Sequence, residues 1–496
     1  MRRAPGARGR GLLRGPGPLP QRRDGDLITE PRQQNAVFEV ERRGFDHIPE
    51  RERTMTLTAT AYFWVGTNAN LFFLSVGVVA LDIGLDVWEA LVAVVLGTSL
   101  FVAVGFASIG GVRSGLPTLT FTRATFGPIG NLPNGVLTWA ALVAFEAINC
   151  IFAVFALLAL MAELGWEHPG DTGRVLATVA VLATSGAIAV YGHATMVYLQ
   201  RGFAVTLTLV LALVLAYSIG GVDWSASAHA DLSVWETLAL ILAGGAVVAS
   251  GPISYLFNAP DFVRYLPSGT SSRSILWTVS LSSGLIALFL SIMGVLLASR
   301  GDMSDPIAGV EPFVPGWLFV LYILAAVGGS IANNVVAYYS SGLVLQAIGL
   351  PLRRWQATAL DTLVSSAIVL YILFVKDFIT VLHDFVAVLI VWLAPFGAVW
   401  ITDALMRRWH YDARDIHDVS PRSRYWGRHG INVRACAALL IGVAVCLLTI
   451  NAPSLDGPVS AALAGADFTW TLGPLASAAA YWALARRSPV TAGPAP

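Results

Sequence analysis

The residues best suited to chemistry lie inside apolar stretches, where polar groups are rare. Within residues 244–267, the pairs Gly251-Pro252 and Pro260-Asp261 interrupt one such stretch. Proline lacks a backbone N–H and clashes with the preceding turn, so we expect a kinked or unwound helix here. In hydrocarbon, such a break is tolerated only where it is buried in protein or lines a watery cavity. Because Tyr255 and Asp261 lie in the same interruption, the pattern favours a binding site, and a proline kink in a packed helix is the alternative.

A second polar patch interrupts the apolar run of residues 55–81. It reads Gly66-Thr67-Asn68-Ala69-Asn70 and falls at about the middle of the run. Asparagine is expensive in a lipid-surrounded helix unless it faces other helices or a cavity. The patch predicts either a hydrogen-bonding seam between helices or a second unwound segment that matches the one near Gly251.

A third group combines an aromatic ring, an acid and an amide. Phe145 and Asn149 stand four residues apart and share one face of a helix, whereas Glu146 points to the side. A ring that stacks and an amide that reads donors and acceptors would together hold a flat heterocycle. A carboxyl at membrane depth is protonated, paired or functional, so Glu146 is either a coupling residue or a structural partner.

A fourth group lies in the run of residues 317–348. Gly329 and Ser330 let a neighbouring helix approach closely, and Asn333-Asn334 add two adjacent amides. Together with unwound carbonyl groups near Gly66, Ser330 would form an oxygen cage suited to sodium or another hard monovalent cation. A packing seam explains the glycines equally well, but it does not explain two adjacent asparagines.

The composition places these groups in an all-α integral membrane protein. Of 496 residues, 56% are hydrophobic and only 12% are charged, with a net charge of zero, so nucleic acid is not an expected partner. The three cysteines lie in apolar segments and predict no disulfide framework. Phosphate-loop, zinc-binding and nucleophile-elbow patterns are missing from the sequence, which argues against an ATP-driven pump or an enzyme.

Apolar runs of spanning length predict twelve transmembrane helices. They are residues 55–81, 87–109, 130–164, 173–191, 202–219, 235–257, 274–298, 317–348, 357–375, 379–406, 433–450 and 468–485. The connections alternate between arginine-rich and acidic, which places both termini in the cytoplasm and the protein in the cytoplasmic membrane.

The predicted organisation has five parts. Residues 1–54 are rich in Arg, Gly and Pro and are expected to form a disordered cytoplasmic N-terminus, and residues 55–406 form a ten-helix transport core. Residues 407–432 form a cytoplasmic loop, residues 433–485 two peripheral helices and residues 486–496 a cytoplasmic tail. The loop carries the only candidate catalytic cluster, which is more simply explained as a solvated loop; its members are His410, Asp412, Asp415, His417 and Asp418.

The interruptions fall in the first and sixth spans, which correspond if spans one to five and six to ten are two copies. Copies of five spans insert in opposite orientations. Interrupted spans at equivalent places in two such halves are typical of the binding site of a secondary transporter.

Six motifs in a fixed order resemble the nucleobase:cation symporter-1 family of cytosine and purine permeases and their hydantoin-transporting relatives. They are IPERERT (48–54), RATFGPIGNLPN (123–134), FEAIN (145–149), NAPDFVRYLP (258–267), SIANNVVAYYSSGL (330–343) and PFGAVWITDALMRRWHYD (395–412). The resemblance implies the ten-helix inverted repeat of leucine-transporter type, with discontinuous helices one and six, plus two further helices.

The family resemblance also implies a division of labour among the site residues. Members stack a planar base between aromatic rings of spans three and six, which correspond to Phe145 and to Tyr255, with Phe257 as second choice. Amides of spans three and eight hydrogen-bond the base; these are Asn149 and either Asn333 or Asn334. Span one supplies Gly66, Thr67 and Asn68.

Coupling is expected to use a co-transported cation, either sodium or a proton, and no other cofactor. The sodium-coupled members use span-one carbonyls and small residues of span eight, here Gly329 and Ser330, near Gly66. One hydroxyl stands where some members have two, which favours protons carried by Glu146, and Asp261 is a further coupling candidate.

The sequence therefore predicts a monomeric secondary transporter that imports a nucleobase or a related planar heterocycle by cation symport. Hydantoin, allantoin or uracil is the alternative substrate for the same fold. A channel is the rival class, but its polar residues would form a continuous stripe, whereas here they cluster at mid-depth.

Overall fold

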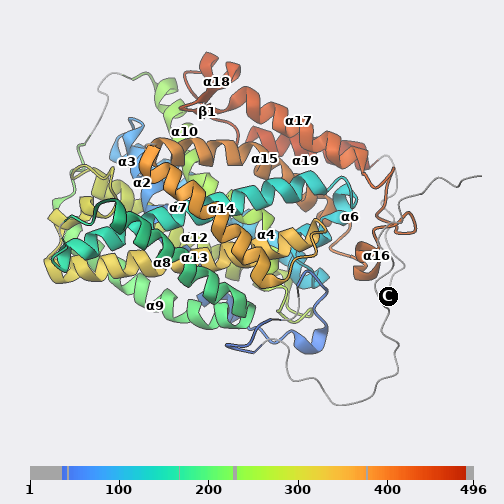
Figure 1. The fold of residues 1–496 in the computed structure, drawn as a ribbon. Helices are drawn as coiled ribbons and strands as arrows, with labels where there is room; N and C mark the ends of the chain where they lie inside the picture. Colours follow the sequence, from blue (N-terminus) through green and yellow to red (C-terminus); the bar gives the residue numbers. More distant parts are fainter. Residues whose placement is uncertain (1–35, 42–43, 167, 227–231, 376–377, 487–496) are drawn as a thin grey trace, which may run out of the picture.

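The computed structural model describes residues 36–41, 44–166, 168–226, 232–375 and 378–486, in which apolar helices pack side by side into one bundle (Figure 1). Among these residues, nine helices are long and apolar enough to cross a membrane, and one bent pair makes a tenth span. The prediction of a multi-pass helical membrane protein is therefore confirmed. The last two predicted spans are the shorter helices α17 (Val433–Thr449) and α19 (Leu472–Ala485), of 17 and 14 residues.

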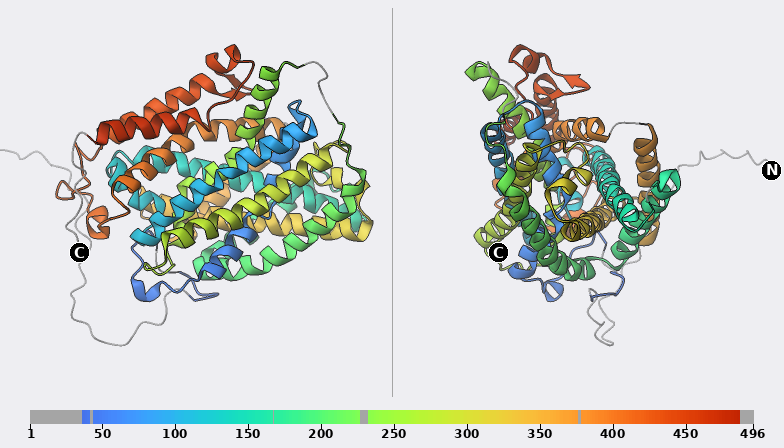
Figure 2. Two further views of the ribbon diagram at one scale, coloured as in Figure 1. Left: turned by 180° about the vertical axis from the view of Figure 1, so that it is seen from behind. Right: turned by 90° about the vertical axis from the view of Figure 1, so that its left-hand side faces the viewer.

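The spans keep the order that the sequence predicts, and Figure 2 shows them from two further sides. Span one is the bent pair of α1 (Leu57–Asn68) and α2 (Leu71–Asp82). The others are α3 (Val87–Ser99) with α4 (Phe101–Ser114), α7 (Leu132–Glu163), α8 (Gly170–Tyr191), α9 (His193–Ser218), α10 (Val234–Ser254), α12 (Ser272–Ala298), α13 (Gly316–Ala347), α14 (Arg354–Val375) and α15 (Phe378–Met406). The connections contain α5 (Thr118–Phe121), α6 (Arg123–Phe126), α11 (Ala259–Val263), α16 (Ala413–His417), α18 (Pro458–Ala462) and the strands β1 (Asn451–Ala452) and β2 (Leu455–Asp456).

Span one is broken between α1 and α2, which meet at an angle of 53°. The asparagines of the polar patch serve the backbone groups that the break leaves unpaired. The Asn70 side chain accepts a hydrogen bond from the Phe72 N–H (2.9 Å) and donates one to the Thr67 carbonyl oxygen (2.8 Å). Asn68 donates to the Trp64 carbonyl oxygen (2.8 Å). The patch is therefore an unwound segment, and its Thr67 carbonyl oxygen also accepts a hydrogen bond from α13 as a seam between helices would.

Span six is broken further along the chain than Gly251-Pro252 indicates. Pro252 lies inside α10, which continues to Ser254 before a 3₁₀ turn (Tyr255–Phe257) and the short helix α11. The hydroxyl groups of Ser250 and Ser254 donate to the carbonyl oxygens of Val247 and Gly251, both at 2.6 Å. Both bonds are local to the helix turns beside Pro252, and the helix unwinds only beyond Ser254.

Two glycines allow α2 and α12 to touch through their backbones. A Cβ atom on Gly77 would fall against the Ser291 carbonyl oxygen, and one on Gly294 against the Leu74 carbonyl oxygen. At the same contact, the Ser291 hydroxyl donates to the Phe73 carbonyl oxygen at 2.9 Å. Small residues that permit such close approach drive helix association in membranes.

Replacing Gly294 with alanine is therefore expected to destabilise the protein. The new methyl group would strike the backbone of α2, which cannot move aside as a flexible side chain would, and overpacking of this kind costs about 1–3 kcal/mol. Thermal unfolding in detergent should show a lower Tm. Gly284→Ala in the same helix is the matched control, because its nearest atom is the Phe101 Cβ at an ordinary 3.5 Å. Equal Tm values for the two variants would contradict the packing argument.

The chain before span one is packed against the bundle where the structure describes it. Ile48 is fully buried and Arg53 is 6% exposed, and both lie within the segment predicted to be disordered. The expectation of disorder is wrong for residues 44–54. The segment has no periodic apolar pattern, but hydrogen bonds to backbone groups far away in the sequence hold it in place. Residues 1–35 of that prediction lie outside the described residues.

The last helix is joined to the core by one buried acid, Asp403 of α15. Its Oδ1 accepts a hydrogen bond from the Tyr481 hydroxyl of α19 (2.6 Å). Its Oδ2 accepts from the Thr125 hydroxyl of α6 (2.8 Å) and from Arg407 Nε (2.7 Å). This joint fixes α19 against α15 at the end of the bundle where the N-terminal residues lie.

Candidate functional site

A small cavity of about 30 Å³ lies where the breaks of spans one and six meet α7 and α13. Each of the four elements contributes both apolar and polar groups to its wall. The polar and aromatic lining residues are Asn70, Phe72, Phe73, Phe145, Asn149, Ser254, Tyr255, Phe257, Asn258 and Asn333. The structure therefore brings together the four segments whose polar residues stand out in the sequence.

Two amides connect the walls of the cavity. Asn149 Nδ2 donates to Asn333 Oδ1 at 3.1 Å and to the Phe145 carbonyl oxygen at 2.9 Å. Asn333 Nδ2 donates to the Thr67 carbonyl oxygen at 3.0 Å and lies 3.3 Å from the Tyr255 hydroxyl oxygen. The Asn333 side chain thus contacts α7 and both broken spans from α13, so a molecule bound here would meet all four elements at once.

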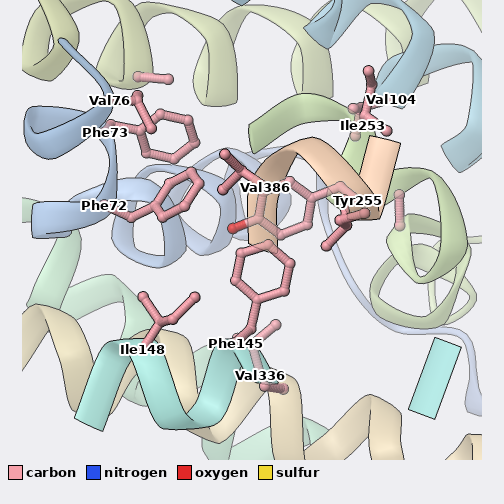
Figure 3. Packing of buried hydrophobic residues seen from close by; sticks show 14 of the residues in the cluster. Phe72, Phe73, Val76, Val104, Phe145, Ile148, Ile253, Tyr255, Val336 and Val386 are labelled. Carbon is pink, nitrogen blue, oxygen red and sulfur yellow. The ribbon is translucent and has the colours of Figure 1, made fainter. Parts of the chain in front are cut away.

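The aromatic rings of the cavity are held edge-on by their neighbours. The Phe145 ring is T-shaped to Phe72 (5.7 Å between centroids) and to Phe385 of α15 (5.1 Å). The Tyr255 ring stands edge-on to Trp64 at 5.2 Å. Figure 3 shows Phe145, Tyr255 and Phe72 gathered around one space. Edge-to-face contacts fix a ring's orientation, so the rings that line the cavity are preorganised.

The structure separates the two adjacent asparagines of α13. Asn333 lines the cavity, whereas Asn334 does not. Asn334 is fully buried, and neither its Oδ1 nor its Nδ2 has a hydrogen-bond partner among the described residues. Of the two candidates that the sequence leaves open, geometry thus places only Asn333 at the cavity.

Span one contributes to the site differently from the prediction. Thr67 offers its carbonyl oxygen, while its hydroxyl is buried and has no hydrogen-bond partner among the described residues. Gly66 faces α9, because a Cβ there would lie 2.5 Å from the Gln200 carbonyl oxygen, and Asn68 bonds back to its own helix. Sequence reasoning did not include Asn70 among the site residues, although it lies in the same polar patch and lines the cavity.

The two acids proposed for coupling lie outside the cavity lining. Glu146 is fully buried and its Oε2 accepts a hydrogen bond from the Ser365 hydroxyl of α14 at 2.6 Å. Asp261 Oδ1 accepts from the backbone N–H (2.7 Å) and the hydroxyl (2.8 Å) of Thr118 in α5. In this arrangement, both carboxyls hold helices together.

Small residues of α13 face the break in span one. A Cβ atom on Gly329 would lie only 2.6 Å from the Ala69 carbonyl oxygen, and Ser330 Oγ is buried without a hydrogen-bond partner among the described residues. A buried hydroxyl and an unwound carbonyl oxygen are each the type of ligand that a hard monovalent cation requires. In the predicted sodium region, α13 thus packs against Ala69 at Gly329, whereas Gly66 faces α9.

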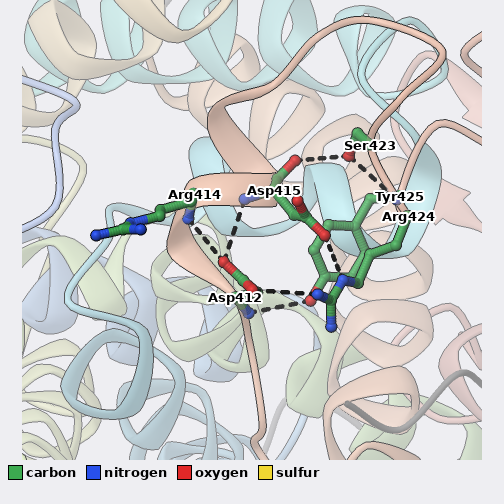
Figure 4. Close-up of polar contacts among 6 residues, drawn as sticks. All are labelled: Asp412, Arg414, Asp415, Ser423, Arg424 and Tyr425. Carbon is green, nitrogen blue, oxygen red and sulfur yellow. Dashed lines mark hydrogen bonds and ion pairs between the residues drawn. The ribbon is translucent and has the colours of Figure 1, made fainter. Parts of the chain in front are cut away.

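The acidic loop that follows α15 is held by its own ion pairs (Figure 4). Asp412 caps the N-terminus of α16 by accepting from the N–H groups of Arg414 (3.0 Å) and Asp415 (3.2 Å). Arg424 forms ion pairs with both Asp412 and Asp415. Among the residues that the structure describes, no group of three or more His, Cys, Asp or Glu side chains could hold a metal ion. The loop acids therefore have structural partners.

Comparison with known proteins gives one family. The profile of the family described as "Permease for cytosine/purines, uracil, thiamine, allantoin" matches residues 47–473. A purine-cytosine permease of Emericella nidulans is 24% identical over 474 residues, which cover 90% of this chain and 89% of the relative. An allantoin permease of Bacillus subtilis is 24% identical over 470 residues, covering 89% of this chain and 92% of that protein.

Solved transporters share the fold. The structure of Mhp1, a nucleobase-cation-symport-1 family transporter in a closed conformation with bromovinylhydantoin bound, superposes with a TM-score of 0.68 at 16% identity. The match covers 92% of this chain and 96% of that one. A substrate-bound, outward-open sodium-coupled sialic acid symporter superposes with a TM-score of 0.53 at 12% identity, covering 89% and 90% of the two chains.

Proposed function

Because the chain belongs to the family of permeases for cytosine/purines, uracil, thiamine and allantoin, we propose that it is a secondary transporter that imports a nucleobase or a related planar heterocycle together with a cation. Its substrate site is the cavity that is lined by the two broken spans (one and six) together with α7 and α13. Breaks in the first and sixth spans support an inverted repeat of five plus five helices. In such a transporter, the bundle alternates between two arrangements that open the site to one side of the membrane and then to the other.

The observation that carries this proposal is the junction of Asn149, Asn333 and Tyr255 beside the Phe145 ring. The Asn149 Oδ1 atom accepts no hydrogen bond from the described residues, and the Tyr255 hydroxyl group has its own proton to donate. A flat heterocycle carries donors and acceptors at its edge and a π-face on each side. An acceptor, a donor and a ring from separate elements match both features.

Topology follows from where the arginines lie. Arg113, Arg264 and Arg407 all occupy the end of the bundle where the N-terminal residues pack. Positively charged connections remain in the cytoplasm. We therefore propose that this end faces the cytoplasm and that both termini lie on that side.

We propose that the co-transported cation binds at the Ala69 carbonyl oxygen and Ser330 Oγ, with sodium as the first candidate. Glu146 as a proton carrier is the second candidate, although its contact with Ser365 places it behind the cavity wall. Sodium bound at the break would favour one arrangement of α1 and α2 and so raise the affinity for the substrate. By thermodynamic linkage, bound substrate must then raise the affinity for sodium by the same factor.

Replacing Ser330 with alanine is expected to raise the sodium concentration needed for half-maximal substrate binding by about tenfold. The change removes one oxygen ligand of the cation and leaves the contacts of the heterocycle in place. A tenfold loss of sodium affinity corresponds to about 1.4 kcal/mol. Ligand binding to purified protein, titrated with sodium at fixed pH, measures the effect. Ser366→Ala is the control, since that hydroxyl bonds only the Thr362 carbonyl of its own helix. An unchanged sodium dependence in Ser330→Ala would remove sodium from this location and promote Glu146.

A thermal-stabilisation screen tests the function itself. Ligands that bind the native state raise the Tm by an amount that depends on their concentration relative to Kd. Cytosine, purines, uracil, allantoin and hydantoins are each added with and without sodium at two pH values. We expect a shift for a planar heterocycle and none for a sugar of similar size. A shift for the ureides alone would select the alternative substrate, and no shift for any heterocycle would contradict the proposal.

A further inference from the structure

Residues 44–56, called here the N-terminal strap, tie α4 to the chain that follows α11. The Ile48 N–H donates to the Gly115 carbonyl oxygen (2.9 Å), and the Met55 N–H donates to the Tyr265 carbonyl oxygen (3.0 Å). Arg53 Nη1 donates to the Val112 carbonyl oxygen (2.7 Å), and Glu50 Oε1 accepts from the Ser268 N–H (2.9 Å). The strap therefore holds the second half of broken span six against span two.

Arg264, directly after α11, is the centre of this contact. Its side chain is fully buried, and Nη1 donates to the carbonyl oxygens of Gly44 (2.9 Å) and Asp46 (3.3 Å) in the strap. Nη2 donates to the Tyr339 hydroxyl of α13 (2.9 Å) and pairs with Glu41 at 3.5 Å. A buried guanidinium needs such partners, so the chain after α11 cannot leave the strap without leaving this charge unpaired.

Glu41 carries the other half of the ion pair and is itself held on three sides. Its Oε1 accepts from the Tyr265 hydroxyl at 2.5 Å, and its Oε2 accepts from the His193 N–H of α9 at 3.0 Å. The His193 ring stacks on Tyr265 with centroids 4.2 Å apart. Glu41 thus joins the residues after α11 to α9 as well.

A column of buried rings fills the space between the cavity and the strap. Tyr255 at the cavity contacts Trp64 (5.2 Å between centroids), Trp64 contacts Phe262 (5.8 Å), and Phe262 contacts Tyr339 (6.2 Å). All four rings are at most 7% exposed. Phe262 belongs to α11, so movement of α11 would open the column, and the strap holds Arg264 and Tyr265 directly after α11.

We propose that the N-terminal strap is the gate at this end of the transporter: a bound molecule passes between the cavity and this end only after Gly44 and Asp46 release Arg264. Two further observations support movement at this place. The short helix α11 is joined to α10 only through the 3₁₀ turn and Asn258. On its other side, the strap borders a cavity of about 440 Å³ that Gly44, Tyr339 and Gln346 help to line, which gives the segment room to move.

The gate rests on the proposed transport function, but its latch can be tested without a substrate. Glu41→Gln removes the charge that pairs with Arg264 and keeps a side chain of the same size. Hydrogen exchange on the purified full-length protein should show at least tenfold faster exchange for the amides of residues 259–268 and unchanged exchange in α12. Glu39→Gln is the matched control, because Glu39 is exposed and lies two residues away in the same segment.

A milder variant guards against a folding defect. Glu50→Gln weakens the bond to the Ser268 N–H and the ion pair with Arg53 at 3.6 Å but leaves the Arg264 contacts in place. Because the Glu50 side chain is 58% exposed, the same amides should exchange faster by a smaller factor. Exchange equal to that of Glu39→Gln in both variants would overturn the proposal. Faster exchange throughout the bundle, α12 included, would also overturn it by showing that the strap only supports the fold.

The functional consequence separates the gate from the transport proposal. In proteoliposomes without a cation gradient, Glu41→Gln should speed the exchange of internal for external heterocycle several-fold relative to Glu39→Gln. If the thermal screen finds no ligand, the transport function fails while the hydrogen-exchange result still decides whether the strap opens. If a ligand binds but the amides of residues 259–268 exchange at the same rate in Glu41→Gln as in the control, the gate proposal fails and the transport function stands.

Discussion

Replacing Asn149 with alanine is expected to reduce heterocycle uptake by about a hundredfold or more. The change removes the Asn149 Nδ2 bond to Asn333 and the Oδ1 acceptor that, on the proposed function, a bound heterocycle would use. A lost hydrogen bond of about 1 kcal/mol and an orphaned buried partner of about 2 kcal/mol together give about 3 kcal/mol. Initial uptake rates in cells, normalised to the amount of protein in the membrane, measure the effect.

Asn334→Ala is the matched control for Asn149→Ala. It makes the same change in a neighbouring amide that is buried without hydrogen-bond partners among the described residues and does not line the cavity. Its uptake should stay within a few-fold of the wild type. Wild-type uptake by Asn149→Ala would remove Asn149 from the site, and a reversed order of the two variants would place the site on the other face of α13.

Replacing Phe145 with alanine is expected to weaken binding of the heterocycle by about tenfold to a hundredfold. Stacking of a base on an aromatic side chain contributes about 1–3 kcal/mol, and alanine offers no ring. The loss of contacts with Phe72 and Phe385 would also free the cavity wall to move. The Kd from isothermal titration on purified protein is the measurement.

Phe145→Trp distinguishes stacking from general packing. An indole has a larger π-face and should retain or strengthen binding if the cavity accommodates it, whereas Phe145→Leu keeps apolar volume without a ring and should behave like alanine. Equal affinities for the leucine and wild-type proteins would show that Phe145 only fills space.

The sequence predicts the broken spans because the break in span one uses local chemistry. The Asn68 and Asn70 side chains bond to backbone within four residues, so a polar patch at mid-depth is enough to indicate the break. The position of the break in span six is predicted less well. α10 accommodates Pro252 and continues to Ser254, so the unwound segment follows the proline at residues 255–258.

Helical spacing in the sequence predicts the cavity residues only where it is clear which face of a helix points to the cavity. Phe145 and Asn149 share a face four residues apart, and both line the cavity. The choice between Asn333 and Asn334 depends on the rotation of α13 about its axis, which packing against α7, α9 and α1 determines. Glu146 likewise faces α14 because of how α7 and α14 pack, and the identity of its neighbour Ser365 is not visible along the chain.

The strap could not be predicted because its contacts are long-range and use backbone atoms. Residues 44–54 lack an apolar period, and their partners Val112, Gly115 and Arg264 lie far away in sequence. Composition describes such a segment as a loose tail. Only the assembled bundle shows that Arg264 needs the carbonyl groups of Gly44 and Asp46.

Uptake into proteoliposomes that contain only this protein tests the central claim most directly. A labelled heterocycle identified by the thermal screen is presented with and without an inward cation gradient or a negative internal potential. Since one charge gains about 2.3 kcal/mol per 100 mV, a symporter should accumulate the heterocycle by up to about fiftyfold at that potential and should release it when the gradient is collapsed. Equilibration to equal concentrations regardless of any gradient would contradict cation symport and select a channel instead.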